Sequence, residues 1–319
     1  MPTFKGYNTL ITILRNKGFK INKTNEGSRV KRVLEKESYY NVVNGYKDLF
    51  LDTTATQTQG KDVIKTNTDF FEMKALYDFD REIRILYLKY ILMIENNFKT
   101  ALAHEFSKLY GCDNYLKLDN FDNSSNENIS DITKLFGDIQ QEIARQMNKN
   151  NPMITHYMSK YGYIPLWVLV NALTLGKITT FYLHMKDSDK IVIAKRFGLN
   201  FKELHKYMSM LGIARNKCAH DERFFNLKFT QNIHTRSIPY FRRIGIPTDA
   251  QNNYIMGIND IFAITIIFKQ MLAKSDFNEF ITALKRQFDK LNNSLKTITL
   301  NDVQKEMGFI TNWTIIKSL

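Results

Sequence analysis

Apolar residues recur at spacings of three and four along much of the chain, a pattern typical of amphipathic α-helices. In the clearest case, 80–110, one stripe is formed by Ile83, Leu86, Tyr87, Tyr90, Ile91, Ile94, Phe98, Leu102, Phe106 and Leu109. Asp78 and Asp80 precede this stripe as candidate N-cap residues, and Gly111 follows it as a candidate helix stop. The spacing therefore predicts one long helix over 80–110.

The same periodicity predicts an all-α fold, because only five prolines interrupt the chain. The polar segments 52–68 and 119–131 have the composition of loops, and Pro239 and Pro247 mark 226–256 as an irregular excursion. No clean boundary separates two independent domains. Further helices are expected at 7–18, 29–49, 131–149, 165–185, 189–197, 201–219, 257–274 and 276–296.

The chain has a formal net charge of +13, and 16 tyrosines and 23 phenylalanines accompany its basic residues. Lysine and arginine displace counterions from phosphates, and aromatic faces stack on unpaired bases, so this balance favours a nucleic acid as a partner. A membrane surface is the weaker alternative. A solvated lysine face and a phenylalanine-rich core would explain the same composition without any nucleic acid.

Several segments bear on the compartment. The most apolar run, 261–268, is well short of the ~18 residues that a membrane span requires, and the chain start carries only a short apolar patch. Cys112 and Cys218 stand far apart without a Cys-x-x-Cys pattern, which predicts neither a disulfide framework nor a zinc site. We therefore expect a soluble, cytoplasmic protein that needs no membrane.

The segment 214–225, ARNKCAHDERFF, carries the side chains with the most chemistry. Arg215 can bind a phosphate through two donors, and His220 can take or give a proton near neutral pH. RNA cleavage by the neighbouring 2′-hydroxyl needs both abilities. Asn216 and His220 share a helix face at i, i+4, whereas Arg215 is rotated from His220 by roughly 140° on an ideal helix. By spacing alone, a plain helix surface explains the pattern better than catalysis does.

Other catalytic arrangements are poorly supported. Cys218 and His220 are two residues apart on the expected helix, so their side chains point away from each other, which argues against a Cys-His nucleophile. Asp78-x-Asp80 and Asp187-x-Asp189 stand just before helical patterns, where helix capping is a simpler explanation than metal binding. We therefore expect no metal and no cofactor.

The segment ARNKCAHDERFFN (214–226) resembles the RN-x-CAH-x-x-R-x-x-N signature of the Abi-like AbiD/AbiF family of bacterial abortive-infection proteins, within the wider HEPN group of α-helical ribonucleases. Four more blocks resemble that family in the same order along the chain. The sequence departs from the family near Phe225, where a Trp is usual, at Ile310, where a Pro is usual, and in the acidic pair Asp221-Glu222. The four blocks are YYNVVNGYKDLF at 39–50, YDFDREIRILYLKYILMIENNFKTALAH at 77–104, IPLWVLVNALTLGKITTFY at 164–182 and MGFITNW at 307–313.

The resemblance implies a HEPN-like helical bundle with additional N-terminal and C-terminal helical segments, in one mainly helical domain over 1–319. The core would span 67–296, flanked by the segments 1–66 and 297–319. It further implies that Arg215 and His220 are the catalytic pair, that Asn216 is a polar helper, and that cleavage needs no metal and leaves a 2′,3′-cyclic phosphate.

Five more residues are candidates for supporting or RNA-binding roles. By position, Arg84 and Glu95 correspond to polar residues of the family's upstream helix, and they lie roughly 16 Å apart along the axis. Glu95 can instead pair with Lys99 at i+4, and that structural ion pair explains Glu95 at least as well as catalysis. Lys217 and Arg223 are candidate phosphate contacts, and a solvated surface arginine explains Arg223 equally well.

Three functions follow as hypotheses. The first is a HEPN-type endoribonuclease that acts as a toxin in antiviral defence, with an RNA or a protein as its antitoxin. The second is a non-catalytic defence module that holds a structured RNA. The third, weaker because of the +13 charge, is an all-α regulator of protein partners. Since the chain contains a single Arg-x4-His motif, Arg215 to His220, and HEPN nucleases by resemblance join two, we expect a homodimer.

Overall fold

The computed structural model describes residues 3–22 and 25–319, and about two thirds of these residues lie in helices. Within those ranges no β-strand forms, and the few β-bridges, such as that between Leu51 and Ile64, are isolated. The all-α fold predicted from periodicity is therefore confirmed. Buried side chains from Ile11 near the start to Ile316 near the end belong to one connected hydrophobic cluster.

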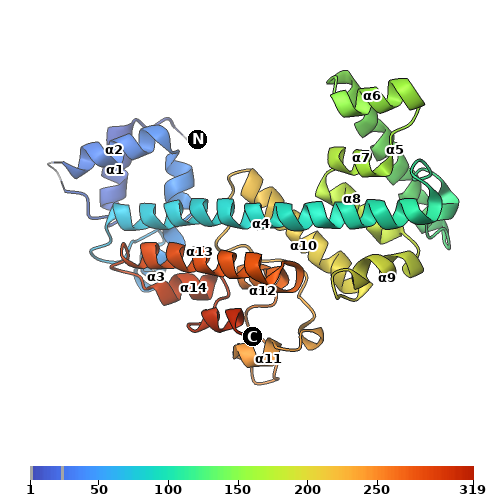
Figure 1. The fold of residues 1–319 in the computed structure, drawn as a ribbon. Helices are drawn as coiled ribbons and strands as arrows, with labels where there is room; N and C mark the ends of the chain where they lie inside the picture. The colour runs from blue at the N-terminus through green and yellow to red at the C-terminus, as the bar shows by residue number, and fades with distance from the viewer. Residues whose placement is uncertain (1–2, 23–24) are drawn as a thin grey trace.

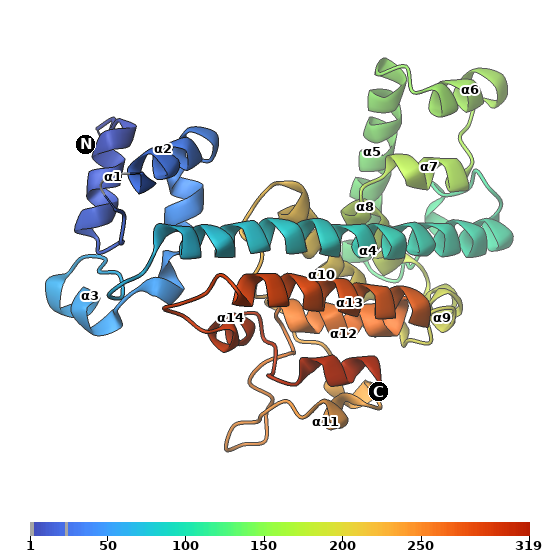
Figure 2. The same ribbon diagram turned by 60° about the vertical axis from the view of Figure 1, so that its left-hand side comes forward.

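Helix α4 (Phe70–Tyr110) is the central element, and it crosses the whole molecule as one rod in Figures 1 and 2. Its 41 residues extend over about 60 Å. The helix begins after Asp69, whose carboxylate accepts the Phe71 N–H at 2.8 Å, and it ends at Gly111, whose φ is +87°. The predicted stop is confirmed, but the predicted start is wrong. Asp78 and Asp80 lie inside the helix, because buried residues at Phe70, Met73, Leu76 and Tyr77 extend the apolar stripe toward the N-terminus.

The chain before α4 forms a small cap at one end of that rod (Figure 1). The helix predicted over 29–49 is wrong as one element, because the backbone becomes extended at Glu37. A short helix also occupies part of 52–68, where we expected a loop, and the Asp52 carboxylate caps it by accepting the Ala55 N–H at 2.9 Å. The elements are α1 (Tyr7–Asn16), α2 (Glu26–Lys36), the π-helical turn η1 (Tyr40–Asn44), the 3-10 turn η2 (Lys47–Phe50) and α3 (Thr53–Gln59).

Helices α12 and α13 run beside the first half of α4 (Figures 1 and 2). The apolar run at 261–268 is buried in α12, which explains its composition as that of a core helix. Tyr87 of α4 donates or accepts a hydrogen bond with Thr265 of α12 at 2.7 Å, and its ring packs against Phe268 and Phe280. These C-terminal elements are α12 (Ile261–Met271), α13 (Lys274–Asn292), α14 (Leu300–Glu306) and the 3-10 turn η5 (Trp313–Lys317).

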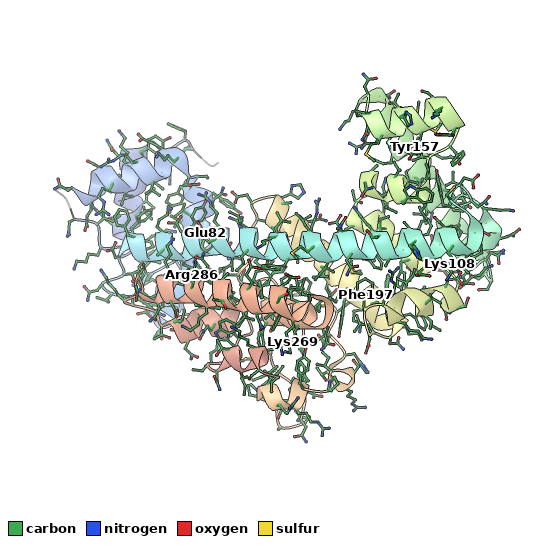
Figure 3. The ribbon with its side chains drawn as sticks, viewed as in Figure 1. Glu82, Lys108, Tyr157, Phe197, Lys269 and Arg286 are labelled. Atoms are coloured by element: carbon green, nitrogen blue, oxygen red, sulfur yellow. The ribbon has the colours of Figure 1, made fainter. Side chains whose placement is uncertain are left out.

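Helices α5 to α9 gather at the other end of α4, and α6 stands away from the rod (Figure 1). In Figure 3, Lys108 marks this end of α4, Glu82 marks the opposite half, and Tyr157 lies on the projecting α6. The helix predicted over 165–185 is divided in two, because Leu173 is extended and the Thr174 hydroxyl caps the next helix at the Lys177 N–H. The elements are the 3-10 turn η3 (Leu118–Asn120), α5 (Asn126–Asn148), α6 (Pro152–Tyr161), α7 (Leu166–Ala172), α8 (Leu175–His184) and α9 (Asp187–Lys195).

Helix α10 (Phe201–Ala219) packs on α4 and carries the motif at its C-terminal end. It begins with a capping box in which Asn200 and Glu203 satisfy each other's backbone N–H groups. The excursion 226–256 is irregular as predicted, with only η4 (Thr235–Ser237) and α11 (Phe241–Ile244) inside it. No helix in 3–22 or 25–319 has the length and apolarity to span a bilayer.

Candidate functional site

The last turn of α10 presents the polar part of the motif. The backbone N–H of His220, the C-cap residue, donates to the Asn216 carbonyl at 3.1 Å, so the helical register persists up to the histidine. The side chains of Asn216 and His220 are both exposed. The imidazole is therefore accessible to a substrate at the C-terminal end of α10.

Arg215 lies on the side of α10 that faces α4. Its Nε is 3.9 Å from Oε2 of Glu95, and the arginine side chain is 34% exposed whereas the glutamate side chain is 8% exposed. Both atoms are buried, and neither has a hydrogen-bond partner within 3–22 and 25–319. The Glu95 carboxylate thus holds the guanidinium by charge rather than by a tight bidentate contact, which leaves the exposed part of the arginine able to bind an anion.

Lys99 completes this buried group. As expected from their spacing, Lys99 and Glu95 form an ion pair, with 2.7 Å between Nζ and Oε1. The same ammonium donates to the Leu173 carbonyl at 2.8 Å, which links α4 to the break between α7 and α8. Because Lys99 is only 8% exposed, its role in this structure is to fix Glu95 rather than to contact RNA.

Arg84 holds the residues that follow His220. This buried arginine lies about three turns before Glu95 on α4. Its Nη2 lies 2.6 Å from Oδ1 of Asp221, and its Nη1 donates to the Glu222 carbonyl at 2.9 Å. Asp221 has φ +56°, a left-handed conformation that is uncommon outside glycine, asparagine and aspartate. Arg84 therefore stabilises the sharp turn that ends α10 directly after the histidine.

Asp80 anchors Phe224 and Phe225, which follow this turn. Its side chain is fully buried, and it accepts the N–H groups of Phe224 and Phe225 at 3.1 and 2.6 Å and the hydroxyl of Tyr46 at 2.5 Å. Burial raises the pKa of Asp80 above its usual value. These three donors and the nearby Arg84 guanidinium lower the pKa and so offset part of that rise. The spacing of four residues between Asp80 and Arg84 was the signal in the sequence for this ion pair. The interpretation of Asp80 as a helix cap was wrong, because Asp80 lies inside α4.

The remaining two candidates are engaged in contacts within the protein. Arg223 donates to the Gly45 carbonyl at 2.5 Å and lies 3.3 Å from the Asp48 carboxylate, so it joins the motif turn to the N-terminal segment. Lys217 forms an ion pair with Glu222. In both ion pairs, each side chain is at least 36% exposed to solvent. An RNA phosphate could therefore replace the carboxylate partner at small cost.

The structure brings Arg215, Glu95 and Lys99 together, and it places His220 beside the turn held by Arg84. Among the described residues, Arg215 and His220 make no hydrogen bond with each other. This agrees with their rotation of roughly 140° around the helix. One chain therefore presents an anchored arginine and an accessible histidine on different sides of the last turn of α10.

Cys218 stands between Arg215 and His220 in the sequence, and its burial disfavours the reactive thiolate form. Burial raises the pKa of its thiol to about 12. We expect its alkylation by iodoacetamide at pH 8, followed by mass spectrometry in a Cys112→Ser background, to be on the order of a thousandfold slower than in the urea-unfolded chain, because only the thiolate reacts. Equal rates in the folded and unfolded chains would contradict this placement.

Within 3–22 and 25–319, no group of three or more histidine, cysteine, aspartate or glutamate side chains is arranged to hold a metal ion. The groups at the end of α10 can bind a phosphate and can transfer a proton. Their arrangement is therefore suited to chemistry on a phosphodiester through general acid–base catalysis and charge stabilisation.

Comparison with known proteins identifies a family. A family model described as Abi-like protein matches residues 32–226, which include η1, α4 and the motif at the end of α10. No curated protein and no solved structure gives a significant match. The matched segment covers more than half of the 319 residues and contains every contact described above for Arg84, Glu95 and Asp80. The chain belongs to the Abi-like protein family.

Proposed function

We propose that this protein is a metal-independent endoribonuclease of the HEPN type that acts in abortive infection. Membership of the Abi-like family supports a role in abortive-infection defence. The observation that supports the nuclease proposal is that the end of α10 carries both an accessible His220 and Arg215, whose guanidinium is held by the buried Glu95. The +13 charge of the chain supports RNA as the substrate class.

The proposed reaction uses the RNA's own 2′-hydroxyl. The His220 imidazole takes the proton of that hydroxyl, and its oxygen forms a new bond to the adjacent phosphorus. The bond between phosphorus and the 5′-oxygen of the next nucleotide then breaks, and a second acid protonates the departing oxygen. Arg215 stabilises the negative charge that develops on the phosphate. The products are a 2′,3′-cyclic phosphate and a 5′-hydroxyl.

Cleavage is expected to continue in excess EDTA, because histidine and arginine can supply both proton transfer and charge stabilisation. The experiment uses 5′-labelled RNA. The product ends are identified with phosphatase, which cannot remove a 2′,3′-cyclic phosphate until acid has opened the ring. A metal-dependent nuclease added to the same RNA serves as the control for EDTA. Loss of cleavage in EDTA with RNA binding intact, or products with a 5′-phosphate, would contradict the mechanism.

The second candidate is a non-catalytic module that holds a structured RNA. It is favoured by one observation, that no hydrogen bond joins Arg215 and His220 among the described residues of a single chain. In this case the protein would bind RNA with a strong dependence on salt and would leave the RNA intact. The experiment above distinguishes the two functions, since only the nuclease produces new RNA ends.

The separation of Arg215 and His220 also supports a homodimer as the active form. A two-fold axis near the end of α10 would place the same residues of a second chain opposite the first, so that one cleft contains two arginines and two histidines. One histidine could then take the 2′-hydroxyl proton while the other protonates the leaving oxygen. The chain offers only one such motif, so the second must come from another copy.

Mixing experiments test this dimer. With random pairing, a ninefold excess of His220→Ala chains would leave only about one tenth of the wild-type chains paired with another wild-type chain. We therefore expect activity per wild-type chain to fall about tenfold after subunit exchange. The control is a ninefold excess of bovine serum albumin, which should leave activity unchanged. Full activity per wild-type chain in the mixture, with a monomeric mass by light scattering, would contradict the dimer.

A further inference from the structure

A cavity of about 940 Å³ lies in the excursion between α10 and α12. The turn η4 and helix α11 form one side, and residues 247–255 form the other. In Figure 1 this part of the chain lies below α12, near the C-terminus. The volume is at the upper end of the range for small-molecule pockets, so a nucleotide would fit inside it.

The wall formed by 247–255 is tied into a fixed shape. Thr248 and Tyr254 form an antiparallel bridge, and the Asp249 N–H donates to the Asn253 carbonyl at 2.9 Å. The Asp249 carboxylate accepts the N–H groups of Gln251 and Asn253 at 2.9 and 2.8 Å. This loop is therefore preorganised, and the one carboxylate in it is occupied by its own backbone.

The floor of the cavity is apolar, with buried Ile233 and Ile238 among its lining residues. The Ile233 N–H donates to the Ile258 carbonyl at 2.8 Å, which fixes the floor against the segment that leads into α12. Tyr254 also lines the cavity, and its ring is held edge to face by Phe241 with 4.7 Å between centroids. An aromatic ring fixed in this way offers a face for a nucleobase.

The polar lining of the cavity suits an anion. Arg236 and Arg242 both line it, both are exposed, and no acidic residue is among the lining side chains. No carboxylate of the described chain lies within 4.0 Å of either guanidinium, whereas most other charged groups near the motif are paired. Asn232, Asn252 and Asn253 add amide groups that can donate to phosphate or base oxygens.

We propose that this cavity binds a nucleotide, with its phosphate on Arg236 and Arg242 and its base against Tyr254. Arginine guanidinium groups bind phosphate oxygens through two parallel hydrogen bonds, and the absence of a competing carboxylate leaves both groups available. The nucleotide is either free in solution or part of an RNA strand, and both present the same phosphate and base.

This cavity is separate from the proposed catalytic site. Lys206 of α10 donates to the Asn232 carbonyl at 3.1 Å, and His234 lies 3.4 Å from Glu203, so the cavity adjoins the first turns of that helix. The nine residues from Lys206 to Arg215 span about 13 Å along the axis. The cavity therefore adjoins the start of α10, Arg215 lies near the end of this helix, and the proposal does not depend on RNA cleavage.

The test measures binding to the full-length protein by calorimetry. The probes are the four ribonucleoside 5′-monophosphates, the corresponding nucleosides, and a mixed-sequence 2′-O-methyl RNA decamer, which has no 2′-hydroxyl to attack. The variant is Arg236→Gln/Arg242→Gln. Its matched control is Arg286→Gln/Lys290→Gln, which removes the same charge from exposed positions on α13, where Figure 3 labels Arg286. Thermal melting by circular dichroism checks that both variants fold.

We expect Kd for at least one phosphate-bearing probe to rise at least about tenfold in the cavity variant and less than about twofold in the α13 variant. A rise for monophosphates assigns the cavity to a free nucleotide, and a rise for the decamer alone assigns it to an RNA strand. His220→Ala should leave the monophosphate Kd unchanged, which separates this site from the nuclease. No binding at about 1 mM, equal loss in both variants, or nucleosides binding as tightly as monophosphates would overturn the proposal.

Discussion

His220→Ala and Arg215→Ala are each expected to lower the rate of RNA cleavage by at least about a hundredfold. A positioned general base contributes typically 10²- to 10⁴-fold, and loss of a donor that stabilises developing phosphate charge costs a similar factor. Neither change should unfold the protein, because His220 is exposed and Arg215 is partly exposed. The helical circular-dichroism signal should therefore stay the same while cleavage is lost.

Matched controls make this expectation sharper. His104 is also exposed and lies on α4 beside Glu105, so His104→Ala removes an equivalent imidazole away from the motif. Arg286→Ala does the same for an exposed arginine on α13. Initial rates on labelled RNA should stay within about twofold of wild type for both controls. If either motif variant retained more than a third of the wild-type rate, the assignment of that residue would be wrong.

The two arginines near the motif differ in what their surroundings allow. Arg84 is only 3% exposed and uses its guanidinium to hold Asp221 and the Glu222 carbonyl, so it cannot also bind a substrate. Arg215 has no hydrogen bond to its Nε and keeps a third of its side chain accessible. Arg84 therefore fixes the turn, whereas Arg215 remains accessible for the phosphate contact that we propose.

The central helices were predictable from sequence because they depend on local signals. The apolar stripe of α4 and the capping residues of α10 are visible within a few turns. The spacing of four residues likewise predicted the ion pair between Glu95 and Lys99. The family resemblance drew attention to Arg215 and His220, and the local pattern alone did not.

The role of Asp80 was not predictable, because its hydrogen-bond partners come from two distant parts of the chain. Its carboxylate meets Tyr46 of the N-terminal segment and the backbone of Phe224 and Phe225 after the motif. A local pattern cannot distinguish an aspartate that begins a helix from one buried inside it when both precede an apolar stripe. The engagement of Arg223 by Gly45 and Asp48 was hidden for the same reason.

The break of the expected helix at 29–49 has a tertiary cause as well. Glu37 becomes extended and receives the Tyr77 hydroxyl and the Arg81 guanidinium of α4, each at 2.8 Å. After this point the chain turns so that Tyr46 stacks on Phe225, with 5.6 Å between ring centroids. Helix propensity in this segment is therefore overridden by contacts with α4 and with the turn after the motif.

Asp80→Ala is expected to lower the free energy of unfolding by about 3 to 5 kcal/mol, the usual cost of breaking a buried charged network from one side. The substitution leaves the Tyr46 hydroxyl and the N–H groups of Phe224 and Phe225 without an acceptor, and it leaves the buried Arg84 guanidinium with one carboxylate partner instead of two. Each unsatisfied buried donor costs about 1 to 3 kcal/mol, so several together account for the expected loss.

Asp78→Ala is the matched control, because Asp78 is an aspartate two residues earlier in the same helix. Its side chain is 46% exposed and pairs only with Lys74, so its replacement should cost less than about 1 kcal/mol. Urea denaturation followed by circular dichroism gives both values. Asp80→Ala should also slow cleavage, since the turn that follows His220 loses its anchor on α4, whereas Asp78→Ala should not. Equal stabilities of the two variants would show that the buried carboxylate does not hold this turn, and the positioning of His220 would then need another cause.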